Sequence, residues 1–149
     1  MPQPTLKLTP QDTESEIPLV ASPLRMVREF HEKFGVEVDT PITKNLVALR
    51  MHLIEEEGLE VSQELLDKYD SPRSPEAINR RKLTKELADL LYVTYGTAVT
   101  FGLPLEEVFE EVHRSNMSKL GDDGKPIRRE DGKVLKGPNY KEPDLERFF

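Results

Sequence analysis

Two groups of carboxylates are the residues of this chain best suited to chemistry. Glu56, Glu57 and Glu60 lie close together in the sequence, and Glu86 and Asp89 form a second group further along. Each residue of an α-helix turns by about 100°, so the first three would share one arc of a helix surface. Residues three apart also share a face, which places Glu86 beside Asp89. Two neighbouring helices could therefore direct five carboxylates at one another.

Five carboxylates in one place favour a metal ion as their partner. Like charges repel strongly when they are brought together in a bundle, unless cations neutralise them or several of them stay protonated. Magnesium binds oxygen ligands and commonly links protein carboxylates to the phosphates of a substrate. The pattern predicts a Mg²⁺ site that acts on a phosphate ester or anhydride. The alternative interpretation is an ordinary solvated helix surface, which is what most acidic runs form.

A di-iron bundle is a second metal-binding interpretation, and the histidines argue against it. Glu110 and His113 supply one Glu-x-x-His pair, but a ferritin-like di-iron bundle needs two such pairs. The other two histidines, His31 and His52, have no glutamate three residues before them. The carboxylates alone therefore remain as predicted ligands.

Apolar residues recur at helical spacing and predict four helices. The expected helices run from 22 to about 34, from 43 to about 69, from 74 to about 101 and from 104 to about 120. Ser22 followed by Pro23 is a typical helix start, and Gly35, Gly102 and Gly121 are typical stops. We therefore expect an all-α four-helix bundle whose second and third helices form the metal-binding pair.

The chain is organised around one helical domain. Its 149 residues are typical of a single domain, and residues 22–120 are expected to form its core. Residues 1–21 contain four prolines among polar residues, which predicts a flexible N-terminal arm. Residues 121–149 are rich in turn residues, including an Asp131-Gly132 pair suited to a short hairpin. This C-terminal tail is predicted to be irregular and is a candidate lid over the active site.

Composition narrows the class of partner. The net charge is −7, which disfavours general binding to nucleic acid through phosphate neutralisation. The chain contains no cysteine, as is common in the reducing cytoplasm. No stretch approaches the roughly 20 apolar residues of a membrane span, and the N-terminus lacks a signal-peptide pattern. We expect a cytoplasmic protein that binds neither membranes nor nucleic acid.

The two carboxylate groups resemble the motifs of a known superfamily. The all-α nucleotide pyrophosphohydrolases carry paired E-E-x-x-E and E-x-x-D motifs, and this chain resembles them with EEGLE at residues 56–60 and ELAD at residues 86–89. The superfamily includes MazG, the dimeric dUTPases and phosphoribosyl-ATP pyrophosphohydrolase. Residues 112–120 and 131–138 are similar to the segment that follows the last core helix in MazG-like members that hydrolyse dUTP.

The resemblance implies a reaction and roles for the five acids. Superfamily members use Mg²⁺ or Mn²⁺ to hydrolyse nucleoside triphosphates between the α and β phosphates, which gives a nucleoside monophosphate and pyrophosphate. By position, Glu56, Glu60, Glu86 and Asp89 would be metal ligands. Glu57 would either bind an additional metal or orient and deprotonate the attacking water.

The same resemblance implies an assembly and a substrate class. Members form dimers or tetramers, so we expect a homodimer or a homotetramer. The expected function is house-cleaning hydrolysis of dUTP or a related deoxynucleotide. Phosphoribosyl-ATP hydrolysis is the enzymatic alternative, and a helical interaction module with surface acids is the non-enzymatic one.

Six further residues are candidates for binding the substrate: Asn116, Lys119, Lys133, Lys136, Tyr140 and His31. The first two lie three apart near the end of the fourth helix and could contact the sugar or the phosphates. The next three lie in the tail and could close over the triphosphate. The histidine lies on the first helix, where it could border a pocket for the base. Each also has an ordinary interpretation, because lysines are usually solvated and a histidine on an apolar helix face is usually a core residue.

Overall fold

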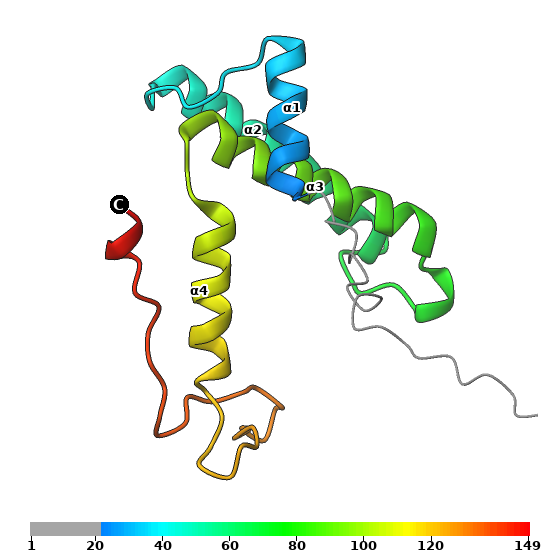
Figure 1. Ribbon diagram of the computed structural model, residues 1–149. Helices are drawn as coiled ribbons and strands as arrows, with labels where there is room; N and C mark the ends of the chain where they lie inside the picture. The colour runs from blue at the N-terminus through cyan, green and yellow to red at the C-terminus, as the bar shows by residue number, and fades with distance from the viewer. Residues whose placement is uncertain (1–21) are drawn as a thin grey trace, which may run out of the picture.

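The computed structural model describes residues 22–149, so the predicted N-terminal arm lies outside the described residues. The described part contains four α-helices, named α1 (Pro23–Phe34), α2 (Lys44–Leu65), α3 (Arg80–Phe101) and α4 (Leu105–Met117). Two short 3₁₀ turns, Pro75–Ala77 and Glu146–Phe148, accompany them (Figure 1). No β-strand occurs among residues 22–149, where only two isolated β-bridges pair backbone segments. The predicted all-α class is confirmed.

Helix α1 has the bounds that its sequence predicts. The Ser22 hydroxyl accepts a hydrogen bond from the Arg25 amide at 3.3 Å, which satisfies one of the free N–H groups of the first turn. Gly35 ends the helix in a left-handed conformation with φ of 67°, a backbone geometry that glycine adopts without a Cβ penalty. The buried side of α1 carries Val27 and His31 and packs against α3.

Helix α2 is shorter than predicted. It begins after Thr43, whose hydroxyl accepts from the Leu46 amide, and it ends at Leu65 rather than near residue 69. The Asp67 carboxylate accepts from two backbone amides of the following turn, so a local side-chain bond replaces the next helical turn. Arg73 then caps the helix by donating to the carbonyls of Gln63 and Leu66.

Helix α3 starts later than predicted. The Ser-Pro-Glu sequence at residues 74–76 suggested a helix start, but it opens only the short turn Pro75–Ala77. The helix begins at Arg80, where the Asn79 side chain accepts from the Lys82 amide. The predicted end at Phe101 is confirmed, because Gly102 closes the helix with φ of 63°.

Helix α4 stands apart from the other three helices. Extensive helix contacts among the described residues join α2 to α3 and α1 to α3, whereas α4 leads away from this group (Figure 1). Glu106 ties the start of α4 to α1 by accepting from the Ser22 hydroxyl and the Leu24 amide. The chain then returns along α4, where the Ser115 hydroxyl donates to the Lys141 carbonyl at 2.8 Å. The predicted turn at Asp131-Gly132 is confirmed, with Gly132 at φ of 84°.

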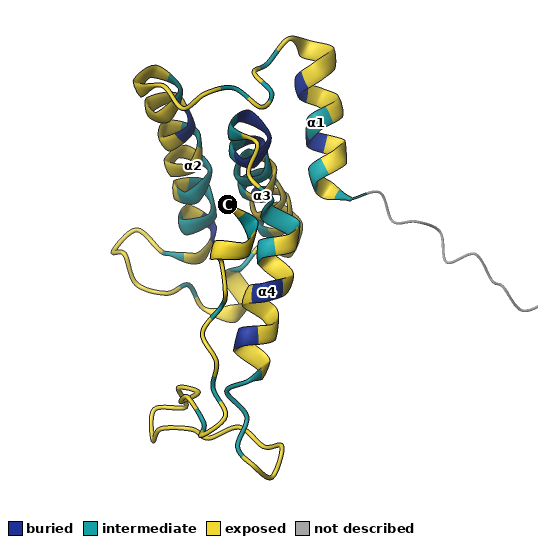
Figure 2. Cartoon of the chain, turned by 60° about the vertical axis from the view of Figure 1, so that its left-hand side comes forward, coloured by how far each residue is buried: buried dark blue, intermediate teal, exposed yellow. Residues whose placement is uncertain are grey.

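Much apolar surface stays uncovered in the single chain. The fully buried hydrophobic residues of the described part are Val27, Ala98 and Val99. Exposed residues lie on all four helices (Figure 2). They include large hydrophobic side chains such as Phe109 on α4 and Leu91 on α3. None of the described helices is both long enough and apolar enough to cross a bilayer.

Candidate active site

The predicted metal-binding pair, α2 and α3, is the most closely packed pair of helices in the described chain. One stripe of α2 faces α3, and its members are spaced alternately three and four residues apart: Arg50, Leu53, Glu57, Glu60 and Glu64. Such spacing keeps side chains on one face of a helix. Glu64 forms an ion pair with Lys82 at one end of the stripe, and Arg50 donates to the Val93 carbonyl at the other. The two helices therefore run antiparallel, with Glu57 and Glu60 between these anchors.

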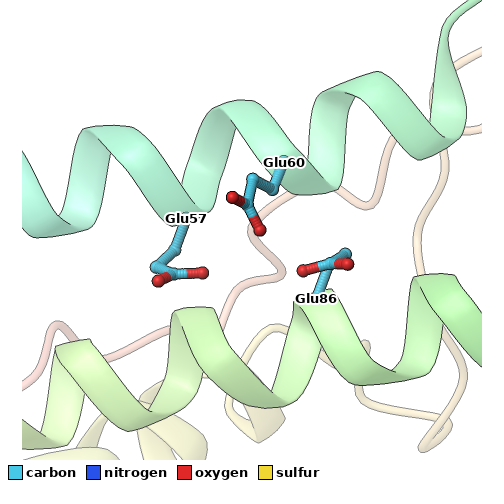
Figure 3. A group of neighbouring side chains, drawn as sticks. All are labelled: Glu57, Glu60 and Glu86. Atoms are coloured by element: carbon cyan, nitrogen blue, oxygen red, sulfur yellow. The ribbon is translucent and has the colours of Figure 1, made fainter.

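Three of the predicted ligands meet between the two helices. One carboxylate oxygen from each of Glu57, Glu60 and Glu86 lies within 4.8 Å of the other two. Figure 3 shows all three side chains pointing into the space between α2 and α3. Glu86 is buried and the two α2 residues are half-buried, so water screens their repulsion only in part. The arrangement gathers negative charge where a cation can neutralise it.

The crowding of these carboxylates affects the protonation of Glu60. A shared hydrogen bond with Glu86, followed by the charge of that residue, raises the pKa of Glu60. The Oε2 atom of Glu57 is buried and has no hydrogen-bond partner in the protein. A buried carboxylate oxygen without a donor is costly unless a cation or a bound group pairs with it. The residues present thus fit a hard, oxygen-binding metal ion.

Asp89 borders the cluster rather than joining it. It lies one turn after Glu86 and is connected to it by Lys85, whose Nζ atom is 2.7 Å from Asp89 Oδ2 and 3.3 Å from Glu86 Oε2. Lys85 was not singled out by its sequence, because a lysine beside acids on a helix is usually a surface residue.

Glu56 lies outside the cluster. Its side chain is exposed and lines a surface pocket together with His52 and Glu55. The sequence prediction centred the acidic arc of α2 on residues 56–60, whereas the stripe that faces α3 passes through Glu57 and Glu60. A rotation of about 100° separates Glu56 from Glu57, so Glu56 lies at the edge of this stripe, where it shares the surface pocket with Glu60.

Residues 27–116, more than half of the chain, match the phosphoribosyl-ATP pyrophosphohydrolase family. The chain belongs to this family. It is therefore a metal-dependent pyrophosphohydrolase, a hydrolase that acts on acid anhydrides. The matched residues contain all five predicted acids and end within α4. No curated protein matches the chain.

The other residues predicted to bind substrate in this pyrophosphohydrolase do not join the cluster within one chain. Lys119 donates to Asn116 at 2.8 Å, and Lys136 lies 4.3 Å from the centre of the Tyr140 ring. These residues and Lys133 belong to the end of α4 and the segment after it, which lie at the far end of α4 from the α2–α3 pair (Figure 1). The predictions for these five residues remain untested by the single chain.

His31 occupies a different place, on the inner side of α1. Its Nδ1 atom lies 2.9 Å from the Glu37 carbonyl, and its ring borders a cavity of about 290 Å³ together with Phe30, Arg50 and Tyr92. Arg50 is buried and donates to the Thr97 hydroxyl as well as to the Val93 carbonyl. The sequence signal for Arg50 was its position seven residues before Glu57, on the same face of α2.

Proposed function

We propose that this enzyme hydrolyses a nucleoside triphosphate between its α and β phosphates, releasing a nucleoside monophosphate and pyrophosphate. The observation that carries the proposal is the Glu57–Glu60–Glu86 cluster, with its unpartnered buried oxygen, in a member of a pyrophosphohydrolase family. The proposed substrate is dUTP or a related deoxynucleotide, removed from the cytoplasmic nucleotide pool.

The donor set supports magnesium as the metal, with manganese as a substitute. All the available donors are carboxylate oxygens, which hard divalent cations prefer. Glu57, Glu60 and Glu86 would hold the ion, and Asp89 would complete the set from the edge of the cluster. When bound, the ion would polarise the phosphate oxygens and lower the pKa of an attacking water.

Glu86 and Glu57 would have different roles in the reaction. Glu86 is buried and anchored on the rigid α3 helix, which suits it to fix the position of the bound phosphates. Glu57 has an oxygen without a donor, so it can accept the proton of the attacking water. A water that loses its proton as it attacks the α phosphate would displace pyrophosphate as the leaving group. Glu57 thus serves as the general base, as a ligand, or as both.

Phosphoribosyl-ATP is the second candidate substrate, because the matched family is named for its hydrolysis. The same bond between α and β phosphates is cleaved, so the cluster alone does not separate the two. Pyrophosphate release should be measured for dUTP, other deoxynucleoside and ribonucleoside triphosphates and phosphoribosyl-ATP, each with Mg²⁺ and with chelator. Release that requires Mg²⁺ supports the proposal, and the preferred compound identifies the substrate. Orthophosphate as the first product would overturn it.

The enzyme is also proposed to act as a homo-oligomer, with a dimer as the smallest unit. Its accessible surface is 12526 Å², whereas a compact monomer of this mass exposes roughly 7,800 Å². Even a fully extended chain of the length of residues 1–21 would add at most roughly 3,300 Å². The excess that remains, above roughly 1,000 Å², is comparable with one side of a standard interface, about 800 Å².

The proposed interface centres on an apolar pocket between α1, α3 and α4. Met26, Leu91 and Phe109 line this pocket of about 430 Å³, and Phe109 leaves 69% of its surface exposed. Light scattering should give at least a dimer for the wild type and a smaller species for Phe109→Glu. Tyr69→Glu is the matched control, since Tyr69 is equally exposed at 74% but lies outside the pocket. A monomeric wild type would overturn this part of the proposal.

An oligomer also gives the C-terminal residues a route to substrate. The segment after α4 begins at the end of that helix far from the α2–α3 pair (Figure 1). We therefore assign Lys133 and Lys136, which belong to this segment, to the site of a neighbouring copy. The end of the tail is fixed to α4, where Glu111 accepts from the Asp144 amide and pairs with Arg147. Residues 121–140 are therefore the part of the tail that would act as the lid. Truncation before Asp122 should weaken substrate binding and leave the helices folded.

A further inference from the structure

Lys85 occupies the place of a cation beside the carboxylate cluster. Its ammonium contacts Asp89 and Glu86 at 2.7 and 3.3 Å. Among residues 22–149, no other lysine or arginine forms an ion pair with Glu57, Glu60, Glu86 or Asp89. The side chain reaches these acids from the solvent side, with 63% of its own surface exposed. A charged group on a flexible stem therefore neutralises the outer edge of the cluster.

A divalent ion and the Lys85 ammonium cannot both contact the Oδ2 atom of Asp89. A magnesium ion approaches its carboxylate ligands to about 2.0–2.1 Å. The ammonium already lies at hydrogen-bond distance from the Oδ2 atom of the same carboxylate, and two cations so close together repel each other. Binding of metal through the Oδ2 atom of Asp89 would therefore displace the Lys85 ammonium outward.

The outward position keeps Lys85 at a solvent-exposed edge of the cluster, where a substrate can approach. Lys85 and Asp89 expose 63% and 38% of their side chains, whereas Glu86 exposes 6%, so this edge of the cluster is open to solvent. A lysine ammonium binds phosphate oxygens as a compact point charge. A triphosphate that bridges to the metal would thus meet the displaced ammonium.

We propose that Lys85 is an exchangeable counter-ion, which neutralises Glu86 and Asp89 in the metal-free enzyme and moves to the substrate phosphates when metal takes Asp89. This inference rests on the proposed function, because it assigns a phosphate-bearing substrate to the same site. In this proposal, Lys85 both competes with the metal for Asp89 and binds the substrate phosphates. A simple surface ion pair, the ordinary role of a lysine four residues before an acid, would do neither.

Lys82 offers a matched control for Lys85. It lies one turn earlier on α3 and is similarly exposed, at 58%, but it pairs with Glu64 outside the cluster. Replacing either lysine by methionine removes one positive charge and keeps a long side chain. General electrostatic effects on metal binding should therefore be similar in the two variants, and a direct exchange should appear only in Lys85→Met.

The first arm measures Mn²⁺ binding to the full chain by titration calorimetry. Lys85→Met should bind Mn²⁺ about two- to fivefold more tightly than the wild type, the factor expected for losing an i,i+4 ion pair. Lys82→Met should stay close to the wild type, and Lys85→Arg should also stay close because its charge is retained. Equal affinities in Lys85→Met and wild type, or equal shifts in the two methionine variants, would overturn the exchange.

The second arm measures inorganic pyrophosphate binding at saturating Mn²⁺. Lys85→Met should weaken this binding by at least about threefold, and Lys85→Arg should restore it, so one substitution changes the two affinities in opposite directions. Tighter metal binding with unchanged pyrophosphate binding would overturn the transfer to phosphate. A wild type that binds Mn²⁺ without binding pyrophosphate would instead count against the proposed function, while the first arm still decides whether Lys85 competes with metal.

Discussion

Adding a methyl group at Gly96 should destabilise the enzyme, whereas the same change at Gly58 should stabilise it. A Cβ atom at Gly96 would lie 2.5 Å from Arg50 Nη2 and 3.2 Å from His31 Nε2. Arg50 is buried and its Nη2 atom donates to the Val93 carbonyl at 2.7 Å. The guanidinium would therefore have to give up this bond or push the two helices apart.

The magnitude follows from two opposing effects. Losing a hydrogen bond to a charged group lowers the free energy of unfolding by about 1.5–3 kcal/mol. Replacing glycine by alanine within a helix raises it by about 1 kcal/mol. Gly96→Ala should thus lower the free energy of unfolding by about 0.5–2 kcal/mol. Gly58 lies within α2 with open space around it, so Gly58→Ala should raise that energy by up to about 1 kcal/mol.

Urea unfolding followed by circular dichroism, at one protein concentration and in chelator, measures both variants. The free energies of unfolding of the two variants should differ by about 1.5–3 kcal/mol. If Gly96→Ala is as stable as Gly58→Ala, then Arg50 does not pack against Gly96. The α2–α3 register that brings Glu60 opposite Glu86 would then have to be revised.

Three further outcomes test the site and the tail. Glu57→Gln, Glu60→Gln and Glu86→Gln should each lower kcat by about a hundredfold or more, while Glu56→Gln should stay active in the same assay, because Glu56 lies outside the cluster. Since Glu86 raises the pKa of Glu60 above its ordinary 4.5, the metal-free wild type should lose stability as pH rises from 4.5 through the raised pKa. Thermal melts in chelator should show a flatter pH profile for Glu60→Gln. Arg114 and the Asp144 amide lower the pKa of Glu111 to about 2, so the attachment of residues 141–149 should hold above pH 4.5 and weaken as pH falls toward 2. Hydrogen exchange of residues 141–149 measures the loss of this attachment. In Glu111→Gln the amides of this segment should exchange quickly even at neutral pH.

The helices were predictable because their signals are local. Ser22, Pro23 and Gly35 specify the ends of α1 through caps that need no distant partner. The errors at the end of α2 and the start of α3 have a common cause. Asp67 forms a turn with its own neighbours, which ends α2 early. Asn79, instead of Ser74, caps the start of α3. Both helix ends therefore depend on side-chain hydrogen bonds, which hydrophobic periodicity does not reveal.

The site was predictable in part because spacing restricts where acids can point. Glu57, Glu60 and Glu86 meet as the two motifs predict. The face of α2 that packs against α3 was not predictable. Arg50 and Glu64 belong to the stripe that faces α3, but hydrophobic periodicity assigns charged residues to the surface. The position of the tail relative to the cluster depends on how α4 packs, and no local signal encodes that packing.

The first products of the reaction show which phosphate bond the enzyme cleaves. The wild-type enzyme should be incubated with Mg²⁺ and the nucleoside triphosphate that it prefers, and the first products should be resolved by ³¹P NMR, with Glu57→Gln as the inactive control. Cleavage between the α and β phosphates should give a nucleoside monophosphate and pyrophosphate in equal amounts, and none of either in chelator. A nucleoside diphosphate with orthophosphate would contradict it.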